Sequence, residues 1–140
     1  MVKKLELSEV LKVGHPEIDA EHGALIDQGN VLIDALERDG LEGFHEQVPI
    51  FFEMLERHFK HEISILRELG FPRVEEHAVY HDQMLRELDT LRRQLEAGAE
   101  LISTDLVHAR VTNLLVHDII REDMEFKSFI IELNRASEVE

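Results

Sequence analysis

The feature that most constrains this chain is a set of long segments in which apolar residues recur at alternating intervals of three and four. This spacing places the apolar residues on one side of an α-helix, which turns about 100° per residue. The chain has only three prolines and seven glycines. Most of them lie between the periodic segments, as in "RDG" at 38–40 and "GFP" at 70–72. The pattern therefore predicts an all-α protein.

We predict four helices joined by short turns. The expected ranges are 18–38, a second helix ending near residue 69, 74–97, and a fourth helix that begins near 103–105 and continues past 117. Ser103 or Thr104 can cap the fourth helix, and Pro49 should lie in or before the first turn of the second. Short connections between long helices indicate an up-down-up-down four-helix bundle, here as a single domain over residues 1–140. The first seventeen or so residues are expected to form an extended N-terminal arm across the bundle.

Several polar residues occupy inward positions of these apolar stripes. In the third helix, for example, two histidines continue the three-and-four spacing that leads on to Met84 and Leu88. The inward polar residues of the four stripes are His22, His58, Glu62, His77, His81 and His117. A single histidine on an apolar stripe is usually an ordinary core residue. Five of them, from all four helices and with a glutamate among them, require a shared explanation.

A metal centre can supply that explanation. Buried polar groups without partners cost on the order of 1–3 kcal/mol each, whereas a whole domain is stable by only about 5–15 kcal/mol. The chain has no cysteine, so any metal must be held by nitrogen and oxygen. Five imidazoles and at least one carboxylate exceed the four ligands of tetrahedral zinc. This donor set favours a dinuclear iron site; manganese, mixed occupancy and an all-protein hydrogen-bond network are the alternatives.

The charge and the N-terminal residues limit the other functions that the chain could have. The formal net charge of −15 argues against binding to nucleic acid or to an anionic membrane surface. The segment "MVKKLELSEV" has no apolar run that could act as a signal peptide, and no stretch approaches the length of a membrane span. We therefore expect a cytoplasmic protein.

The spaced motifs resemble those of the bacterial hemerythrins over nearly the whole chain. The matching segments are "VGHPEIDAEH" (13–22), "HFKHE" (58–62), "GFPRVEEHAVYH" (70–81) and "HDIIRE" (117–122). The resemblance implies two iron ions joined by an oxo or hydroxo bridge. It also implies reversible binding of dioxygen for carriage, storage or sensing, rather than catalysis.

The resemblance also implies a role for individual residues. One iron would be held by His77, His81 and His117, and the other by His22 and His58. Glu62 and Glu122 would bridge the two ions. The implied oxygen pocket would be lined by Leu25, Phe59, Asn113, Leu114 and Asp118. Such a pocket must be dry, because water and protons would destroy the oxygenated form.

The chain departs from the family pattern at three positions. Glu122 stands where an aspartate bridge is usual, Asn113 where a tryptophan is usual, and Asp118 where an aliphatic residue is common. The family's offset of five residues after His117 implies Glu122 as the bridge, and its extra methylene extends its reach. Asp123 is shorter, and an ideal helix places it on the other side, so we expect it to be the less favoured residue. The polar Asn113 and Asp118 favour a rival function, a di-iron oxidoreductase acting on oxygen, peroxide or nitric oxide. An iron-responsive interaction module is a third alternative.

The remaining histidines are expected to lie outside the centre. His61 is about 60° from His58 and about 100° from Glu62 on a helix, so we expect it to flank the site without binding metal. His15, His45 and His108 are expected at the surface.

Overall fold

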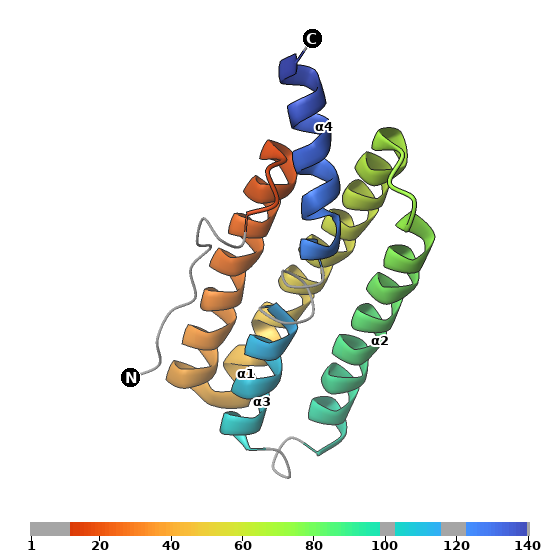
Figure 1. Ribbon diagram of the computed structural model, residues 1–140. Coiled ribbons are helices and arrows are strands. Elements are labelled where there is room, and N and C mark those ends of the chain that lie inside the picture. Colours follow the sequence, from red (N-terminus) through yellow and green to blue (C-terminus); the bar gives the residue numbers. More distant parts are fainter. Residues whose placement is uncertain (1–11, 99–102, 116–122, 140) are drawn as a thin grey trace.

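The computed structural model describes residues 12–98, 103–115 and 123–139, and within these ranges all regular structure is helical. The elements are α1 (Pro16–Leu69), α2 (Val74–Gly98), α3 (Thr104–Asn113), the short 3₁₀-helix η4 (Met124–Phe126) and α4 (Lys127–Val139). Figure 1 shows a bundle in which the two halves of α1, then α2, then α3 run in alternating directions, with α4 at one end. The predicted all-α four-helix bundle is confirmed.

α1 consists of two helices joined by a sharp kink at Gly40. Gly40 has φ 69° and ψ −152°, a conformation that is essentially restricted to glycine because a Cβ would crowd the backbone. The chain reverses there, and the arms 16–39 and 41–69 run side by side, with a hydrogen bond from Gln28 to Gln47 at 3.3 Å (Figure 1). The predicted helix end at "RDG" is confirmed.

Local hydrogen bonds close both ends of α1. At the N-terminus, Nδ1 of His15 accepts a hydrogen bond from the Ile18 N–H at 3.4 Å. Pro16 follows in the first turn, where its missing N–H costs nothing. At the C-terminus, the Phe71 N–H donates to the Leu66 carbonyl at 2.9 Å. Because His15 acts as the cap, the helix begins two residues before the predicted position.

The prediction for Pro49 is wrong. The second arm of α1 begins directly after Gly40, so Pro49 lies about two turns inside it rather than in or before its first turn. A proline at this depth leaves the carbonyl of His45 without its helical hydrogen bond. Pro49 is exposed, so water can supply the missing partner and the helix continues.

The predicted boundaries of the later helices agree with the structure to within a residue where they are described. α2 ends at Gly98, one residue beyond the predicted end. Ser103 caps α3, because its Oγ accepts a hydrogen bond from the Leu106 N–H at 3.1 Å. α3 ends at Asn113 and is followed by two residues in π-helical conformation. The predicted continuation past His117 falls in residues 116–122, outside the described ranges.

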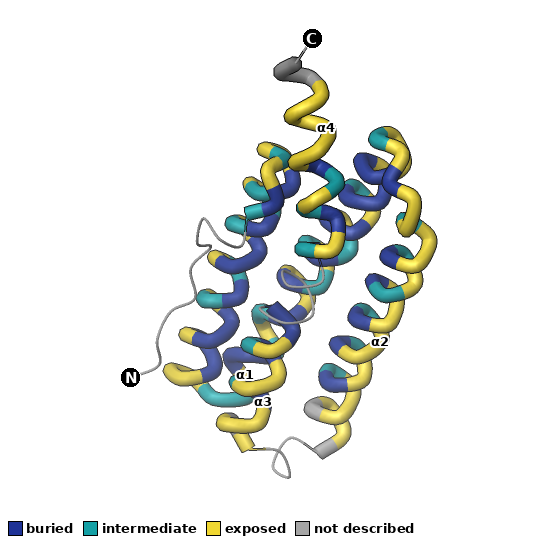
Figure 2. The backbone as a smooth tube through the Cα atoms, viewed as in Figure 1, coloured by how far each residue is buried: buried dark blue, intermediate teal, exposed yellow. Residues whose placement is uncertain are grey.

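Buried apolar side chains form two clusters, and Figure 2 shows the buried faces turned toward the inside of the bundle. The larger cluster packs the two arms of α1 against α2 and α3 and includes Leu25 and Leu55. The smaller cluster lies at the ends of the two arms that are distant from Gly40. It packs them against η4 and α4 and includes Ile18 and Leu66. On each arm of α1, the stretch between the two clusters carries buried polar residues.

The outward faces of the helices are exposed (Figure 2), and many of their residues are charged. Ion pairs there include Arg57 with Glu53 at 2.8 Å and Arg92 with Asp89 at 2.6 Å. None of the helices in the described ranges has the length and apolar character needed to cross a membrane. The predicted N-terminal arm falls mostly in residues 1–11, which lie outside the described ranges.

The kink can be tested with two glycine-to-alanine substitutions. A Cβ at Gly40 or at Gly23 would meet no other atom within 4 Å, so the two positions differ mainly in backbone conformation. Gly40→Ala should lower the free energy of unfolding by about 1–3 kcal/mol because φ is positive there. Gly23→Ala lies in a helix and should raise it by about 0.5–1 kcal/mol. Urea denaturation of the metal-free variants measures both; equal effects would contradict the role of Gly40.

Candidate metal centre

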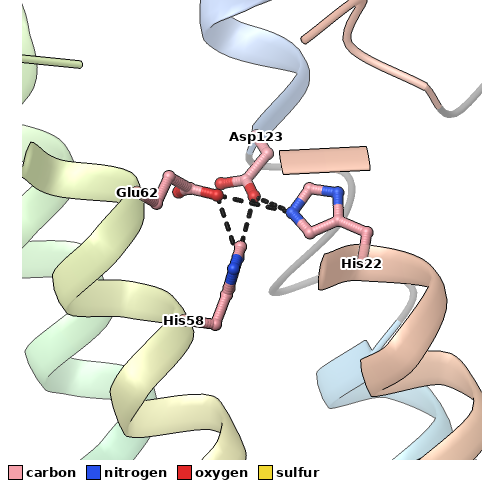
Figure 3. Close-up of side chains that lie close together, drawn as sticks. All are labelled: His22, His58, Glu62 and Asp123. Atoms are coloured by element: carbon pink, nitrogen blue, oxygen red, sulfur yellow. Dashed lines mark ion pairs between the residues drawn. The ribbon is translucent and has the colours of Figure 1, made fainter. Parts of the chain in front are cut away.

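Six polar side chains are buried together between the two apolar clusters. They come from both arms of α1, from α2 and from the residue that precedes η4. They are His22, His58, Glu62, His77, His81 and Asp123, and each is at most 3 % exposed. Figure 3 shows four of them, with the imidazoles of His22 and His58 directed at the carboxylates of Glu62 and Asp123.

Helical spacing explains why these side chains converge. His58 and Glu62 are four residues apart on the second arm of α1, and His77 and His81 are four apart on α2. Residues four apart lie on the same face of a helix, about one turn from each other. Each helix therefore presents a pair of donors to the interior.

The first group of donors consists of His22, His58 and one oxygen of each carboxylate. Nε2 of His22 lies 2.6 Å from Oδ2 of Asp123 and 3.4 Å from Oε2 of Glu62. Nε2 of His58 lies 3.0 Å from Oε2 of Glu62 and 4.0 Å from Oδ2 of Asp123. Both imidazoles thus face the same two oxygens.

The second group consists of His77, His81 and the other oxygen of each carboxylate. Nε2 of His77 lies 2.9 Å from Oε1 of Glu62 and 2.7 Å from Oδ1 of Asp123. Nε2 of His81 lies 3.0 Å and 3.9 Å from the same two oxygens. Each carboxylate therefore gives one oxygen to each histidine pair, an arrangement consistent with a dinuclear metal site.

The donors approach one another closely, but many of them do not form hydrogen bonds. Nε2 of His22, His58 and His81, Oε2 of Glu62 and Oδ2 of Asp123 are buried without a hydrogen-bond partner in the described part of the chain. Leaving such groups unpaired is costly, whereas a cation placed among them would satisfy several lone pairs at once. The arrangement of these side chains therefore suits coordination of a metal better than hydrogen bonding among themselves.

The two carboxylates also control protonation in the metal-free protein. Burial alone would lower the pKa of His22, but Asp123 and Glu62 outweigh it and raise the pKa to about 10. The same balance raises the pKa of His77 to about 10. Burial would raise the pKa of Glu62, but its contacts with the four histidines hold that pKa well below the usual range. Without metal, protons therefore compensate the buried negative charge.

A third carboxylate, Glu21, contacts the centre from outside. Nδ1 of His58 lies 2.7 Å from Oε1 of Glu21, and Nδ1 of His61 contacts Oε2 of the same residue. Nε2 of His61 lies 3.2 Å from Glu17, and the His61 side chain is 41 % exposed. The contact with Glu21 raises the pKa of His61. The structure thus places His61 beside the site, where we expected it.

Five of the seven predicted metal-binding residues lie together in the structure. They are His22, His58, Glu62, His77 and His81. The other two, His117 and Glu122, are in the range 116–122 and lie outside the described residues, so their roles remain predictions. Sequence reasoning did not identify Glu21. Its position directly before the candidate ligand His22 only weakly indicates a role at the centre. Its contact with His58 depends on how the two arms of α1 are aligned.

Asp123 requires a correction. We expected Glu122 rather than Asp123 to reach the metals, but the Asp123 carboxylate lies within the centre and is fully buried. That expectation assumed one continuous ideal helix. α3 ends at Asn113, the next two residues are π-helical, and Asp123 directly precedes a 3₁₀-helix. The residues between His117 and Asp123 lie outside the described ranges, but the described turns that flank them are not ideal α-helix, so a rotation of 100° per residue is not a sound basis for placing Asp123.

The predicted pocket residues fall into two groups. Leu25 and Phe59 are buried beside the centre: Leu25 lines a cavity with His58, and the ring of Phe59 stacks on His81 at a centroid distance of 3.8 Å. Leu114 is buried and Asn113 is exposed. These two residues line a different cavity, of about 230 Å³, whose described lining includes none of the six centre residues. Asp118 lies outside the described residues.

The fold and the centre define a class: a helical bundle with a buried site of histidines and carboxylates suited to two metal ions. A comparison with protein families matches residues 13–130 to the hemerythrin HHE cation binding domain. Because the match covers most of the chain, the protein belongs to the hemerythrin family, and the predicted resemblance is confirmed. A comparison with curated protein sequences found no match.

The raised pKa values lead to a prediction for the metal-free protein. His22 and His77 have pKa values of about 10 when folded, against 6.5 when unfolded. Their stabilising effect is therefore complete below about pH 6.5 and is lost as the pH rises toward about 10. The free energy of unfolding of the metal-free protein should fall over this interval.

Bound metal displaces these protons, so the loaded protein should not show this fall. Urea denaturation across the interval tests both forms; a flat profile without metal would contradict the proton-compensated centre.

Proposed function

We propose that the centre holds two iron ions and that this pair binds dioxygen reversibly, for carriage, storage or sensing. The observation that carries the proposal is the division of the Glu62 and Asp123 oxygens between two histidine pairs. Imidazole and carboxylate donors without thiolate suit iron, and carboxylates in helical bundles commonly bridge two such ions. Manganese or mixed occupancy is the alternative.

Each residue of the centre has a distinct part in this proposal. His22 and His58 would hold one ion, and His77 and His81 the other, together with the predicted His117. Glu62 would bridge the ions, and the second bridge would be either Asp123, whose carboxylate lies in the centre, or Glu122, the residue predicted from the sequence. When bound, a di-iron pair supplies two electrons and an open coordination position for dioxygen. The protein's contribution is to hold neutral imidazoles and to keep the site dry.

Exclusion of water is the property that separates reversible binding from consumption of oxygen. Phe59 is 3 % exposed and covers one face of the His81 ring, with an interplanar angle of 8°. Leu25, 2 % exposed, lies beside His58 on the opposite arm of α1. These apolar side chains support the binding function over the oxidoreductase alternative. Asp118, the residue that would favour the alternative, lies outside the described ranges.

The wider setting of the protein follows from the same proposal. We expect residues 1–140 to act as one hemerythrin-like domain whose partner is dioxygen. The net charge of −15 supports the absence of nucleic-acid binding. A cytoplasmic location remains a prediction.

Metal analysis tests the composition of the centre. Protein purified under iron-replete conditions should contain close to two irons per chain, because two donor groups share both carboxylates. Asp123→Ala should reduce this content, whereas Glu125→Ala, an exposed carboxylate two residues further on, should retain it. Glu122→Ala measured alongside decides which carboxylate acts as the second bridge. One metal per chain, or zinc as the main metal, would contradict the proposal.

Dioxygen binding is tested by anaerobic reduction followed by exposure to air, monitored by visible absorbance. Reversible binding predicts a new spectrum that disappears when oxygen is removed and returns over several cycles. Phe59→Ala should shorten the lifetime of the oxygenated form, because it uncovers the His81 ring. Phe52→Ala removes a phenyl ring that is not among the contacts of the centre and is the matched control. Immediate oxidation with release of hydrogen peroxide would instead support the oxidoreductase alternative.

A further inference from the structure

The contact between Glu21 and His58 sets His58 apart from His22 and His81. A carboxylate can only accept hydrogen bonds, so Nδ1 of His58 donates to Oε1 of Glu21 at 2.7 Å. Nδ1 of His22 and Nδ1 of His81, by contrast, are buried without a partner in the described residues. The tautomer of His58 is therefore set from outside the centre.

This hydrogen bond determines what His58 offers to the interior. With the proton on Nδ1, the neutral imidazole has its lone pair on Nε2, which faces Oε2 of Glu62 at 3.0 Å without a hydrogen bond. Two lone pairs facing each other repel unless a cation lies between them. A carboxylate on the far nitrogen also makes the imidazole a stronger electron donor.

Glu21 is itself held in place. Its second oxygen contacts Nδ1 of His61, and Nε2 of His61 lies 3.2 Å from Glu17. Glu21 and His61 belong to opposite arms of α1, so their contact fixes the carboxylate across the gap between the arms. Both residues also line a cavity of about 380 Å³ that extends to His58 and Leu25.

We propose that Glu21 is a positioning residue for the metal centre, which fixes the tautomer and orientation of His58, and that His61 holds Glu21 in that position. The inference rests on the metal-binding part of the proposed function and is independent of dioxygen. It makes the two halves of the centre unequal. The half formed by His22 and His58 gains a carboxylate behind one ligand, and its metal should be retained more firmly because of it.

The test measures iron release from the loaded, full-length protein under anaerobic conditions, using an excess of a ferrous chelator. Glu21→Met keeps the length of the side chain but cannot accept this hydrogen bond. It should speed the release of one iron by about 10- to 100-fold and leave the second at the parental rate. Glu21→Gln keeps an acceptor oxygen and should give an intermediate rate. Glu53→Met, which removes an exposed carboxylate that pairs with Arg57 at 2.8 Å, is the matched control and should resemble the parent.

Three results would overturn the positioning role. The first is that Glu21→Met releases iron at the parental rate, and the second is that it releases both irons faster to the same extent. The third is that Glu21→Gln releases iron as fast as Glu21→Met, which would leave no role for the hydrogen bond. A parent protein that holds no iron would instead refute the proposed function, so the two failures are distinguishable. The metal-free Glu21→Met protein should keep the helical content of the parent, measured by circular dichroism, which separates positioning from a failure to fold. The visible spectrum of the oxidised iron form should also change in Glu21→Met and stay unchanged in Glu53→Met.

Discussion

Two buried carboxylates shared by four imidazoles are the constraint on which the rest of the structure depends. In the described residues, the ion-pair partners of Glu62 and Asp123 are all histidines, so no lysine or arginine neutralises them. Charge of this kind must be compensated inside the protein, by protons or by metal. Because the donors come from both arms of α1, from α2 and from the residue before η4, compensation also joins these elements to one another.

The layered interior follows from this constraint. Apolar clusters lie on both sides of the polar layer, so the donors are removed from water in both directions along the bundle. Gly40 makes this possible by reversing α1, which places His22 opposite His58 with ring centroids 4.9 Å apart. Burying polar groups without a metal ion costs free energy, and a metal ion bound among them recovers that free energy. Metal content is therefore coupled to the stability of the fold.

The sequence predicted the parts of this structure that depend on spacing within one helix. The three-and-four periodicity identified His58 with Glu62, and His77 with His81, as inward pairs, and the structure confirms that they are buried together. It did not place Asp123 in the centre, because that expectation assumed an ideal helix from His117, whereas the described turns nearest to this stretch are π- and 3₁₀-helical. The contact of Glu21 with His58 was not predicted, since it depends on an alignment of the two arms of α1 that one sequence does not reveal.

The differences between the two halves of the centre lie outside the donors themselves. Both halves share the same carboxylates, yet His58 has Glu21 on its far nitrogen while His81 has the flat face of Phe59. A carboxylate partner increases the electron density that an imidazole donates, whereas an aromatic cover excludes water without donating to the ligand. Two metal ions held between the same bridges would therefore differ in electron density and in access to solvent.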